Sequence, residues 1–342
     1  MEATKKLTVS SSPHVKSPMT VTRIMADVII SLIPAGVAGT LIFGGRALLV
    51  MAVCILSCVV FEYLSRKVLK RSNTLGDLSA VVTGLLLAYN LPVQIPLWMC
   101  VIGSFVAIVI VKQLFGGIGQ NFANPAITAR IVMLVSFASA MTNFTNPTLW
   151  KYDAVASATP LSSLNALDLS GSVTEQIKAL SAGGTLPTIK EMLFGVRAGC
   201  IGETCAAALL LGALYLIARG IISPRIPFAY ILTVGVFMLC VSKGSLTYTL
   251  YEITAGGLLL GAFFMATDYT TSPITKKGKI VFGIGAGILT SVIRLYGSLP
   301  EGVSYSILLM NIACPLIEKA TRPGYFGQIK EKKSKKKEEA AS

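Results

Sequence analysis

Charged residues are scarce in this sequence. Asp, Glu, Lys and Arg together make up 13% of the 342 residues, whereas hydrophobic residues make up 53%. Soluble domains carry about a quarter charged residues. A soluble enzyme of this length would need an exceptional core to reach this composition, so the sequence predicts an all-α protein with several membrane-spanning helices.

Histidine and paired cysteines are scarce as well. The one His, His14, lies in a Ser- and Pro-rich stretch, which excludes His-based catalysis and His-ligated haem. The seven Cys form no C-x-x-C pair, and most lie in apolar runs, where Cys usually packs as a small hydrophobic residue. We therefore predict no metal site and no complete catalytic site within this chain.

Ten apolar segments approach the length of about 20 residues that a membrane-spanning helix needs. One long polar break, residues 142–198, separates the first five segments from the last five. The ten segments are 24–43, 47–64, 78–91, 96–114, 125–141, 199–218, 226–241, 246–266, 280–296 and 303–317.

The net charge of +14 is distributed unevenly. With the N-terminus in the cytoplasm, most of the 30 Lys and Arg fall in cytoplasmic connections and in the tail KEKKSKKKEE, as is typical of membrane proteins. This tail suits anionic lipid, and no nucleic-acid partner is predicted. The predicted organisation is a cytoplasmic tail (1–23), five helices (24–141), an extracytoplasmic loop (142–198), five helices (199–317) and a basic cytoplasmic tail (318–342).

The two groups of helices share a similar stretch. DLSAVVTGLLLA begins at Asp77 and EITAGGLLLGA begins at Glu252, and the two enter the membrane from opposite sides. We therefore predict two five-helix inverted repeats, an arrangement that places functional groups at the repeat interface. Membrane carboxylates are costly and often functional, which makes Asp77 and Glu252 candidates for an ion pathway. The alternative is that each is a residue at the membrane surface that caps a helix or pairs with a Lys or Arg.

Other polar residues in the apolar segments have simpler explanations. Glu62 is expected to pair with Arg66, which follows it by one helical turn. Arg130 is expected to pair with a buried acid or to bind a ligand. It ends GGIGQNFANPAITAR, in which Gly, Asn and Pro interrupt the helix at the membrane surface. The freed amides can hydrogen-bond a polar ligand, or the stretch is a plain helix start with Pro in the first turn.

The polar break contains DAVASATPLSSL, residues 153–164. No nucleophile-elbow pattern or Ser–His pair accompanies these hydroxyl groups, and a hydroxyl without a nearby base does not make a hydrolase. A hydroxyl among small residues suits covalent modification by another enzyme. The alternative is an unmodified surface loop rich in Ser and Thr.

Motifs across nearly the whole chain resemble the family of the Rnf electron-transport complex D subunit and, more distantly, of the sodium-pumping NADH:quinone reductase B subunit. Members have ten spans with cytoplasmic termini. The motifs are GGIGQNFANPA, IGETCAAALLLGALYLI, ISPRIPFAY, GAFFMATDYTTSPITKKGK and IRLYGSLPEGVSYSILLMNIACPLI.

The resemblance implies a covalent flavin. Family members carry FMN joined through its phosphate to a Thr in a motif similar to Asp-x-x-Ser-Gly-Ala-Thr, and a separate flavin transferase installs it. The matching run here extends from Asp153 to Thr159, which makes Thr159 the implied attachment residue. Ala156 and Ser157 stand where the family usually has Ser and Gly.

The resemblance also implies a non-covalent riboflavin in the membrane region. In the family this flavin is associated with the Asn-rich start of the helix that GGIGQNFANPA opens. Asn121 and Asn124 are the matching residues here, and they are therefore the implied riboflavin ligands.

The implied function is that of one subunit in a redox-driven ion pump of the bacterial inner membrane. Electrons would pass between ferredoxin and NAD, which partner subunits would bind, and Na⁺ or H⁺ would cross the lipid bilayer. Within the family the alternative is the quinone-reductase B subunit. A flavin-free secondary transporter is the alternative of another class, because inverted five-helix repeats also suit solute carriers.

The charge asymmetry predicts the topology. A reporter that works only outside the cytoplasm should be active when fused after Lys190, and one that works only inside should be active after Lys337. Exchanging the two reporters gives the control, and activity in the exchanged positions would contradict the predicted orientation.

Overall fold

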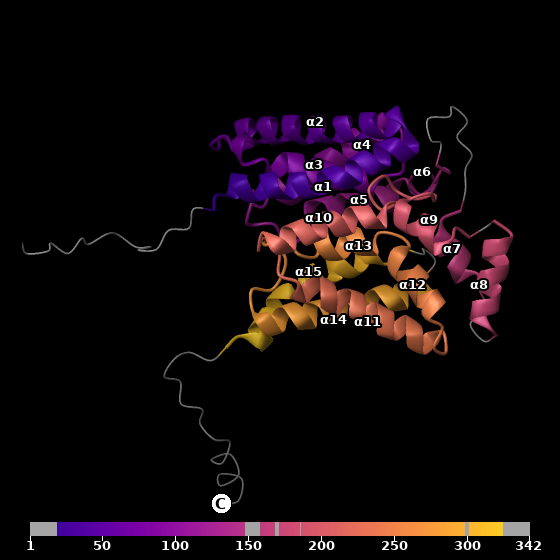
Figure 1. Ribbon diagram of the computed structural model, residues 1–342. Coiled ribbons are helices and arrows are strands. Elements are labelled where there is room, and N and C mark those ends of the chain that lie inside the picture. Colours follow the sequence, from indigo (N-terminus) through magenta and orange to yellow (C-terminus); the bar gives the residue numbers. More distant parts are fainter. Residues whose placement is uncertain (1–18, 148–157, 168–170, 185, 298–300, 324–342) are drawn as a thin grey trace, which may run out of the picture.

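The computed structural model describes residues 19–147, 158–167, 171–184, 186–297 and 301–323. Within these ranges the chain forms helices joined by turns, and none of the described residues belongs to a strand (Figure 1). The prediction of an all-helical fold is therefore confirmed for this part of the chain.

The first group of helices follows the predicted segments closely. Gly44, with φ +78°, separates the first two helices, and Pro125 occupies the first turn of α5, where its missing N–H costs nothing. The bounds are α1 (Val21–Phe43), α2 (Gly45–Val68), η1 (Leu75–Asp77), α3 (Ser79–Tyr89), α4 (Leu97–Phe105), its π-helical continuation η2 (Val106–Gln113), α5 (Pro125–Ser136) and α6 (Ala138–Met141).

The second group differs from the prediction at two segments. The sixth becomes helical only at Ala206, because residues 199–205 form turns. The eighth is broken near Gly256, which has φ +62°, and its two parts are bent by 64°. The bounds are α10 (Ala206–Ala218), α11 (Arg225–Val241), α12 (Leu246–Thr254), α13 (Leu258–Leu260), η3 (Gly261–Met265), α14 (Lys276–Tyr296) and α15 (Val303–Thr321).

The long polar break contains three short helices, α7 (Pro160–Asn165), α8 (Val173–Ala182) and α9 (Ile189–Phe194). They lie together at one end of the molecule, and all three contact α12 (Figure 1). The first turn of α1 and the last turn of α15 lie at the opposite end (Figure 1). The polar segment is thus a folded cap on one end of the helices.

Several helices suit a membrane. Four (α1, α2, α14 and α15) are long and apolar enough to cross it alone, and α12 with the following helix makes a fifth, bent crossing. Other apolar helices are shorter, such as α3 with 11 residues. At 1.5 Å per residue α3 extends about 17 Å, roughly half of the hydrocarbon core. The described helices therefore support a multi-pass membrane protein.

The two groups meet through helices in equivalent positions. The first helices of the groups, α1 and α10, pack along each other, and the last helices, α5 and α15, are also in contact. Small residues allow the close approach of α1 and α10, because a Cβ added at Gly212 would lie 2.0 Å from the backbone oxygen of Ser31. Contacts between equivalent helices are what a twofold relation between the groups produces.

Arg130 on α5 joins three parts of the structure. Its guanidinium donates to Asn90 Oδ1 at 2.9 Å, to Ser304 Oγ at 3.1 Å and to the carboxylate of Glu301. The expected pairing of Arg130 with an acid is confirmed. The acid comes from the other group of helices, so this ion pair also holds the two groups together.

The expected pairing of Glu62 with Arg66 is wrong. The fully buried Glu62 accepts a hydrogen bond from Lys112 Nζ at 2.6 Å and another from Thr74 Oγ1 at 3.0 Å. Lys112 lies at the end of η2 and is 2% exposed. Arg66 is also buried but forms no ion pair among the described residues, so a cation brought in by tertiary packing replaces the one expected from the spacing along the helix.

We expect Lys112→Met to destabilise the protein by about 3–5 kcal/mol, because it leaves the Glu62 carboxylate buried without its cation. The double variant Lys112→Met with Glu62→Met should recover most of the loss, since an apolar replacement of a buried pair is often neutral. Thermal unfolding in detergent measures both.

The control is Arg219→Met. Arg219 pairs with Asp27 at 3.2 Å but is 41% exposed, so its loss should cost less than about 1 kcal/mol. A double variant no more stable than Lys112→Met alone would contradict this account of the pair.

Candidate functional site

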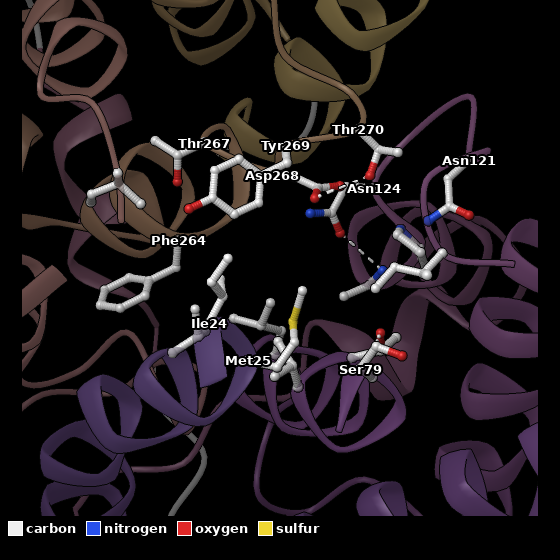
Figure 2. A pocket seen from close by; sticks show the side chains of 18 of the residues that line it. Ile24, Met25, Ser79, Asn121, Asn124, Phe264, Thr267, Asp268, Tyr269 and Thr270 are labelled. Carbon is white, nitrogen blue, oxygen red and sulfur yellow. Dashed lines mark hydrogen bonds between the residues drawn. The ribbon is translucent and has the colours of Figure 1, made fainter. Parts of the chain in front are cut away.

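A cavity of about 100 Å³ lies between the two groups of helices. Its walls come from the first turns of α1, from α3, from the residues before α5 and from the turn that follows η3 (Figure 2). Asn121, Asn124 and Asp268 all line it. The structure therefore brings both predicted flavin ligands into one cavity and adds an acid to them.

Asn124 is held by the start of α5. Its Oδ1 accepts from the backbone N–H groups of Ala126 and Ile127 at 3.1 and 3.3 Å, and its Nδ2 donates to the backbone oxygen of Met265 at 3.3 Å. The side chain is 4% exposed. Asn124 thus caps α5, as the simpler explanation of the motif required, and fixes α5 against the end of η3.

Asn121 has an unused acceptor. Its Oδ1 is buried and has no hydrogen-bond partner among the described residues. A buried polar atom without a partner costs free energy unless a ligand or water satisfies it. The ring of a flavin carries an N–H donor, so Asn121 fits this group.

Asp268 lies in the turn after η3, beside Asn124 (Figure 2). Its carboxylate accepts from Thr271 Oγ1 at 3.3 Å and from Thr270 Oγ1 at 3.4 Å. Burial raises the pKa of the Asp268 carboxyl above its ordinary value, and these hydrogen bonds oppose the rise. The cavity therefore combines an amide acceptor with an acid whose charge is costly.

Asp77 is connected to the wall of this cavity. It accepts from the backbone N–H of Ser79 at 2.8 Å and from the Ser79 hydroxyl, and thereby caps the start of α3. Lys112 Nζ donates to the same hydroxyl at 2.6 Å. A continuous chain of polar contacts therefore runs from Asp77 through Ser79 and Lys112 to Glu62, and Ser79 and Lys112 both line the cavity.

Glu252 lies on α12, which contacts the short helices α7 to α9, whereas Asp77 lies in η1, which contacts α1, α2 and α3. It is fully buried and accepts from Arg294 at 2.9 Å. Arg294 also donates to the backbone oxygens of Glu252 and Ala255. The pair therefore satisfies the carbonyl groups that the break after α12 leaves open.

Thr159 is the N-cap of α7. Its Oγ1 accepts from the backbone N–H of Ser162 at 3.4 Å, and the residue is only 8% exposed. The neighbouring motif residues Asp153, Ala156 and Ser157 lie outside the described residues. A modifying enzyme could reach this hydroxyl only while the folded cap that contains α7 to α9 is open.

A second cavity of about 660 Å³ lies beside Thr159. Ala158 and Pro160, the two neighbours of Thr159 in the chain, form part of its wall, together with Arg197 and Glu191. We did not expect a role for Arg197 from the sequence. Arg197 lies just after Gly195 in a stretch without hydrophobic periodicity. Its position just before the sixth apolar segment is the one feature of the sequence that points to it.

Three potential metal ligands converge near Arg130. Cys200 Sγ and one carboxylate oxygen each from Glu203 and Glu301 lie within 4.8 Å of one another. Arg130 donates to Glu301 and lies 3.8 Å from Cys200 Sγ. The Arg130 guanidinium therefore places a positive charge next to the carboxylates of this cluster.

The sequence matches the model of the NQR2, RnfD, RnfE family over residues 8–327. A protein of Acetobacterium woodii, named as the D subunit of the Na(+)-translocating ferredoxin:NAD(+) oxidoreductase complex, is 47% identical, covering 96% of this chain and 98% of the relative. The proton-translocating counterpart of Clostridium ljungdahlii is 46% identical, covering 94% and 96%.

A third relative, from Stutzerimonas stutzeri, is named as the D subunit of an ion-translocating oxidoreductase complex. It is 36% identical and covers 90% of this chain and 92% of its own length. The matches therefore extend over nearly the whole of both chains, helices and polar segment included. The chain belongs to the NQR2, RnfD, RnfE family.

Proposed function

We propose that this chain is the D-type membrane subunit of an ion-translocating ferredoxin:NAD oxidoreductase. The observation that carries the proposal is the near full-length match to relatives named as this subunit. These names favour a redox subunit over a flavin-free transporter and over a quinone-reductase subunit. The other subunits of the complex are its partners, and they bind ferredoxin and NAD.

The transported ion is Na⁺ or H⁺. Relatives that are 47% and 46% identical to this chain are named for different ions, Na⁺ and H⁺ respectively. Carboxylates in membrane helices serve either ion. Asp77, through its contacts toward Lys112, and Glu252, through its pair with Arg294, are the proposed pathway residues on the two sides.

The proposed topology has ten crossings in two inverted five-helix repeats, residues 24–141 and 199–317, in the bacterial inner membrane. Contacts between the equivalent pairs α1 with α10 and α5 with α15 support the repeat. The positive charges support cytoplasmic tails, residues 1–23 and 318–342. Residues 142–198, which include α7 to α9, then face outward.

Two flavins complete the proposal. FMN is attached through its phosphate to Thr159 on the outer face by a flavin transferase, and the large cavity beside Thr159 supports this site. Riboflavin binds without a covalent bond at the first cavity, where Asn121 Oδ1 has no partner among the described residues. The volume of this cavity, about 100 Å³, is below the roughly 300 Å³ of a small-molecule pocket, so the surrounding helices must move apart to admit the ring. The flavins supply the one-electron chemistry, and this chain supplies their placement and electrostatic surroundings.

Thr159→Ala should abolish the covalent flavin. Wild-type protein produced with the transferase should gain the mass of an FMN phosphoester and give a fluorescent band on a denaturing gel. The alanine variant should lose both, because no other residue occupies the attachment position. Removal of the cap should cost about 1 kcal/mol of stability.

The matched controls are Ser157→Ala and Ser162→Ala, which remove neighbouring hydroxyl groups and should retain mass and fluorescence. Fluorescence that persists in Thr159→Ala would contradict the site. A wild-type protein without covalent flavin, made with an active transferase, would contradict the flavin itself.

Asn124→Leu should lower the non-covalent flavin of the purified complex, because the leucine loses both the cap of α5 and the contact to η3. The covalent flavin should remain unchanged and serves as the internal control. Asn121→Leu, which removes the unpartnered acceptor without removing a cap, should act in the same direction. Unchanged riboflavin in both folded variants would exclude both Asn as flavin ligands and leave Asn124 with its role as the cap of α5 alone.

A further inference from the structure

The cavity beside Thr159 has the size of a binding site for a ring system. Its volume of about 660 Å³ lies within the range of roughly 300–1,000 Å³ that is typical of small-molecule pockets. It is formed by the residues around Thr159, by the segment before α9, and by the turn that holds Arg197. Among the described residues that line it, only Glu191 and Arg197 carry a charge.

The Arg197 guanidinium is buried and donates only to uncharged acceptors among the described residues. Nε donates to the backbone oxygen of Thr204 at 3.1 Å, Nη1 to that of Thr254 at 2.7 Å, and Nη2 to that of Glu203. Nη1 also lies 3.5 Å from Met192 Sδ. These contacts fix the position of the guanidinium without neutralising its charge.

Arg197 differs in this respect from three other buried cations, whereas Arg66, which is 8% exposed, likewise has no carboxylate oxygen of the described residues within 4 Å. Lys112, Arg130 and Arg294 each form an ion pair with a glutamate. For Arg197, which is 3% exposed, no carboxylate oxygen of the described residues lies within 4 Å. Burial lowers the pKa of its guanidinium to about 10, so that the charge is still present at neutral pH.

The charge of the nearby buried Glu203 raises the pKa of the Arg197 guanidinium and offsets part of the cost of its burial, although the two side chains form no ion pair within 4 Å. A buried cation without an ion-pair partner is a candidate for a functional role. The other charged residue of the cavity does not neutralise it, because Glu191 is exposed and its carboxylate accepts from the backbone N–H and the hydroxyl of Thr188. Arg197 therefore places a fixed positive charge, partly offset by Glu203, at the wall of the cavity.

We propose that the cavity beside Thr159 holds the ring of the flavin attached to that residue, and that Arg197 provides the counter-charge for the negative charge that the ring gains on reduction. This inference rests on the proposed covalent FMN. Because Ala158 and Pro160 line the cavity, a group attached to Thr159 is already at its edge.

The step is a one-electron transfer. The electron comes from a one-electron donor, such as reduced ferredoxin acting through partner subunits, and enters the ring system. No bond is formed or broken and no proton is taken up, so the ring gains one negative charge. The nearby fixed positive charge stabilises this product more than the oxidised ring, and the reduction potential rises.

The test uses the full-length protein, flavinylated by the transferase and purified in detergent. Its flavins are titrated spectroelectrochemically, with dithionite as the final reductant. The transition missing in Thr159→Ala identifies the flavin on Thr159. Arg197→Gln should disfavour its one-electron reduction about tenfold, which corresponds to about 59 mV toward lower potential. The covalent flavin content should be unchanged.

Two further variants separate charge from folding. Glu191→Gln keeps a residue that can complete the capping box of α9. It removes the one negative charge among the described residues that line the cavity. We expect it to favour reduction of the flavin by only about twofold, because solvent screens the exposed carboxylate. Lys190→Gln removes an exposed cation from the same helix outside the cavity lining and should leave the potential unchanged.

The outcomes distinguish the inference from the proposed function. Covalent flavin absent from the wild type overturns the proposed function, and with it the occupant of the cavity. Covalent flavin present but with the same potential in Arg197→Gln and Glu191→Gln overturns the inference alone. If Arg197→Gln fails to fold, the shift in Glu191→Gln decides, because that residue is exposed and its capping role is preserved.

Discussion

A charge inside a membrane protein must be compensated locally, because no solvent is present to screen it. This constraint accounts for where the helices of this chain stop. Lys112 lies next to the start of the short helix α3, and Arg294 lies at the break after α12. Each cation pairs with a glutamate and also contacts polar groups at the helix end. The buried charges therefore stabilise the interruptions that the membrane would otherwise disfavour.

The same constraint gives the two groups of helices a related design. Lys112 belongs to the fourth predicted segment of the first group and Arg294 to the fourth of the second. Their partners differ in position, since Glu62 lies on the second helix of its group and Glu252 on the third. Each group therefore contains a buried cation–glutamate pair, but its members lie on different helices in the two groups. Arg130 and Glu301 then join the groups across their interface.

Sequence patterns predicted the helices well and the interruptions poorly. Hydropathy locates an apolar segment, and α1, α2, α14 and α15 begin and end within a few residues of the prediction. The turns at 199–205 lie in an apolar run that hydropathy does not distinguish from a helix, and the break near Gly256 falls at a Gly-Gly pair inside a segment that was predicted to be one helix.

The residues of the candidate site could be predicted from the sequence only where they lie close together in the chain. Asn-Pro at 124–125 is a readable helix start, and the structure confirms the cap. The partner of Glu62 could not be read, because Lys112 is 50 residues away. The role of Arg197 could not be predicted from the sequence, because one of its hydrogen-bond acceptors, the backbone oxygen of Thr254, is 57 residues away along the chain. Asn121 and Asn124 were found together because they are close in the chain, whereas Asp268 joins them only through the fold.

The shortness of α3 and α12 has a consequence for biosynthesis. Helices of 11 and 9 residues are too short to cross the hydrocarbon core, and each carries or adjoins a carboxylate that opposes entry into lipid. The polar partners of both segments are synthesised later: Arg294 on α14 pairs with Glu252, and Lys112 on η2 donates to Ser79, which in turn donates to Asp77. We therefore expect neither segment to enter the bilayer as an independent unit before its downstream neighbour has been made.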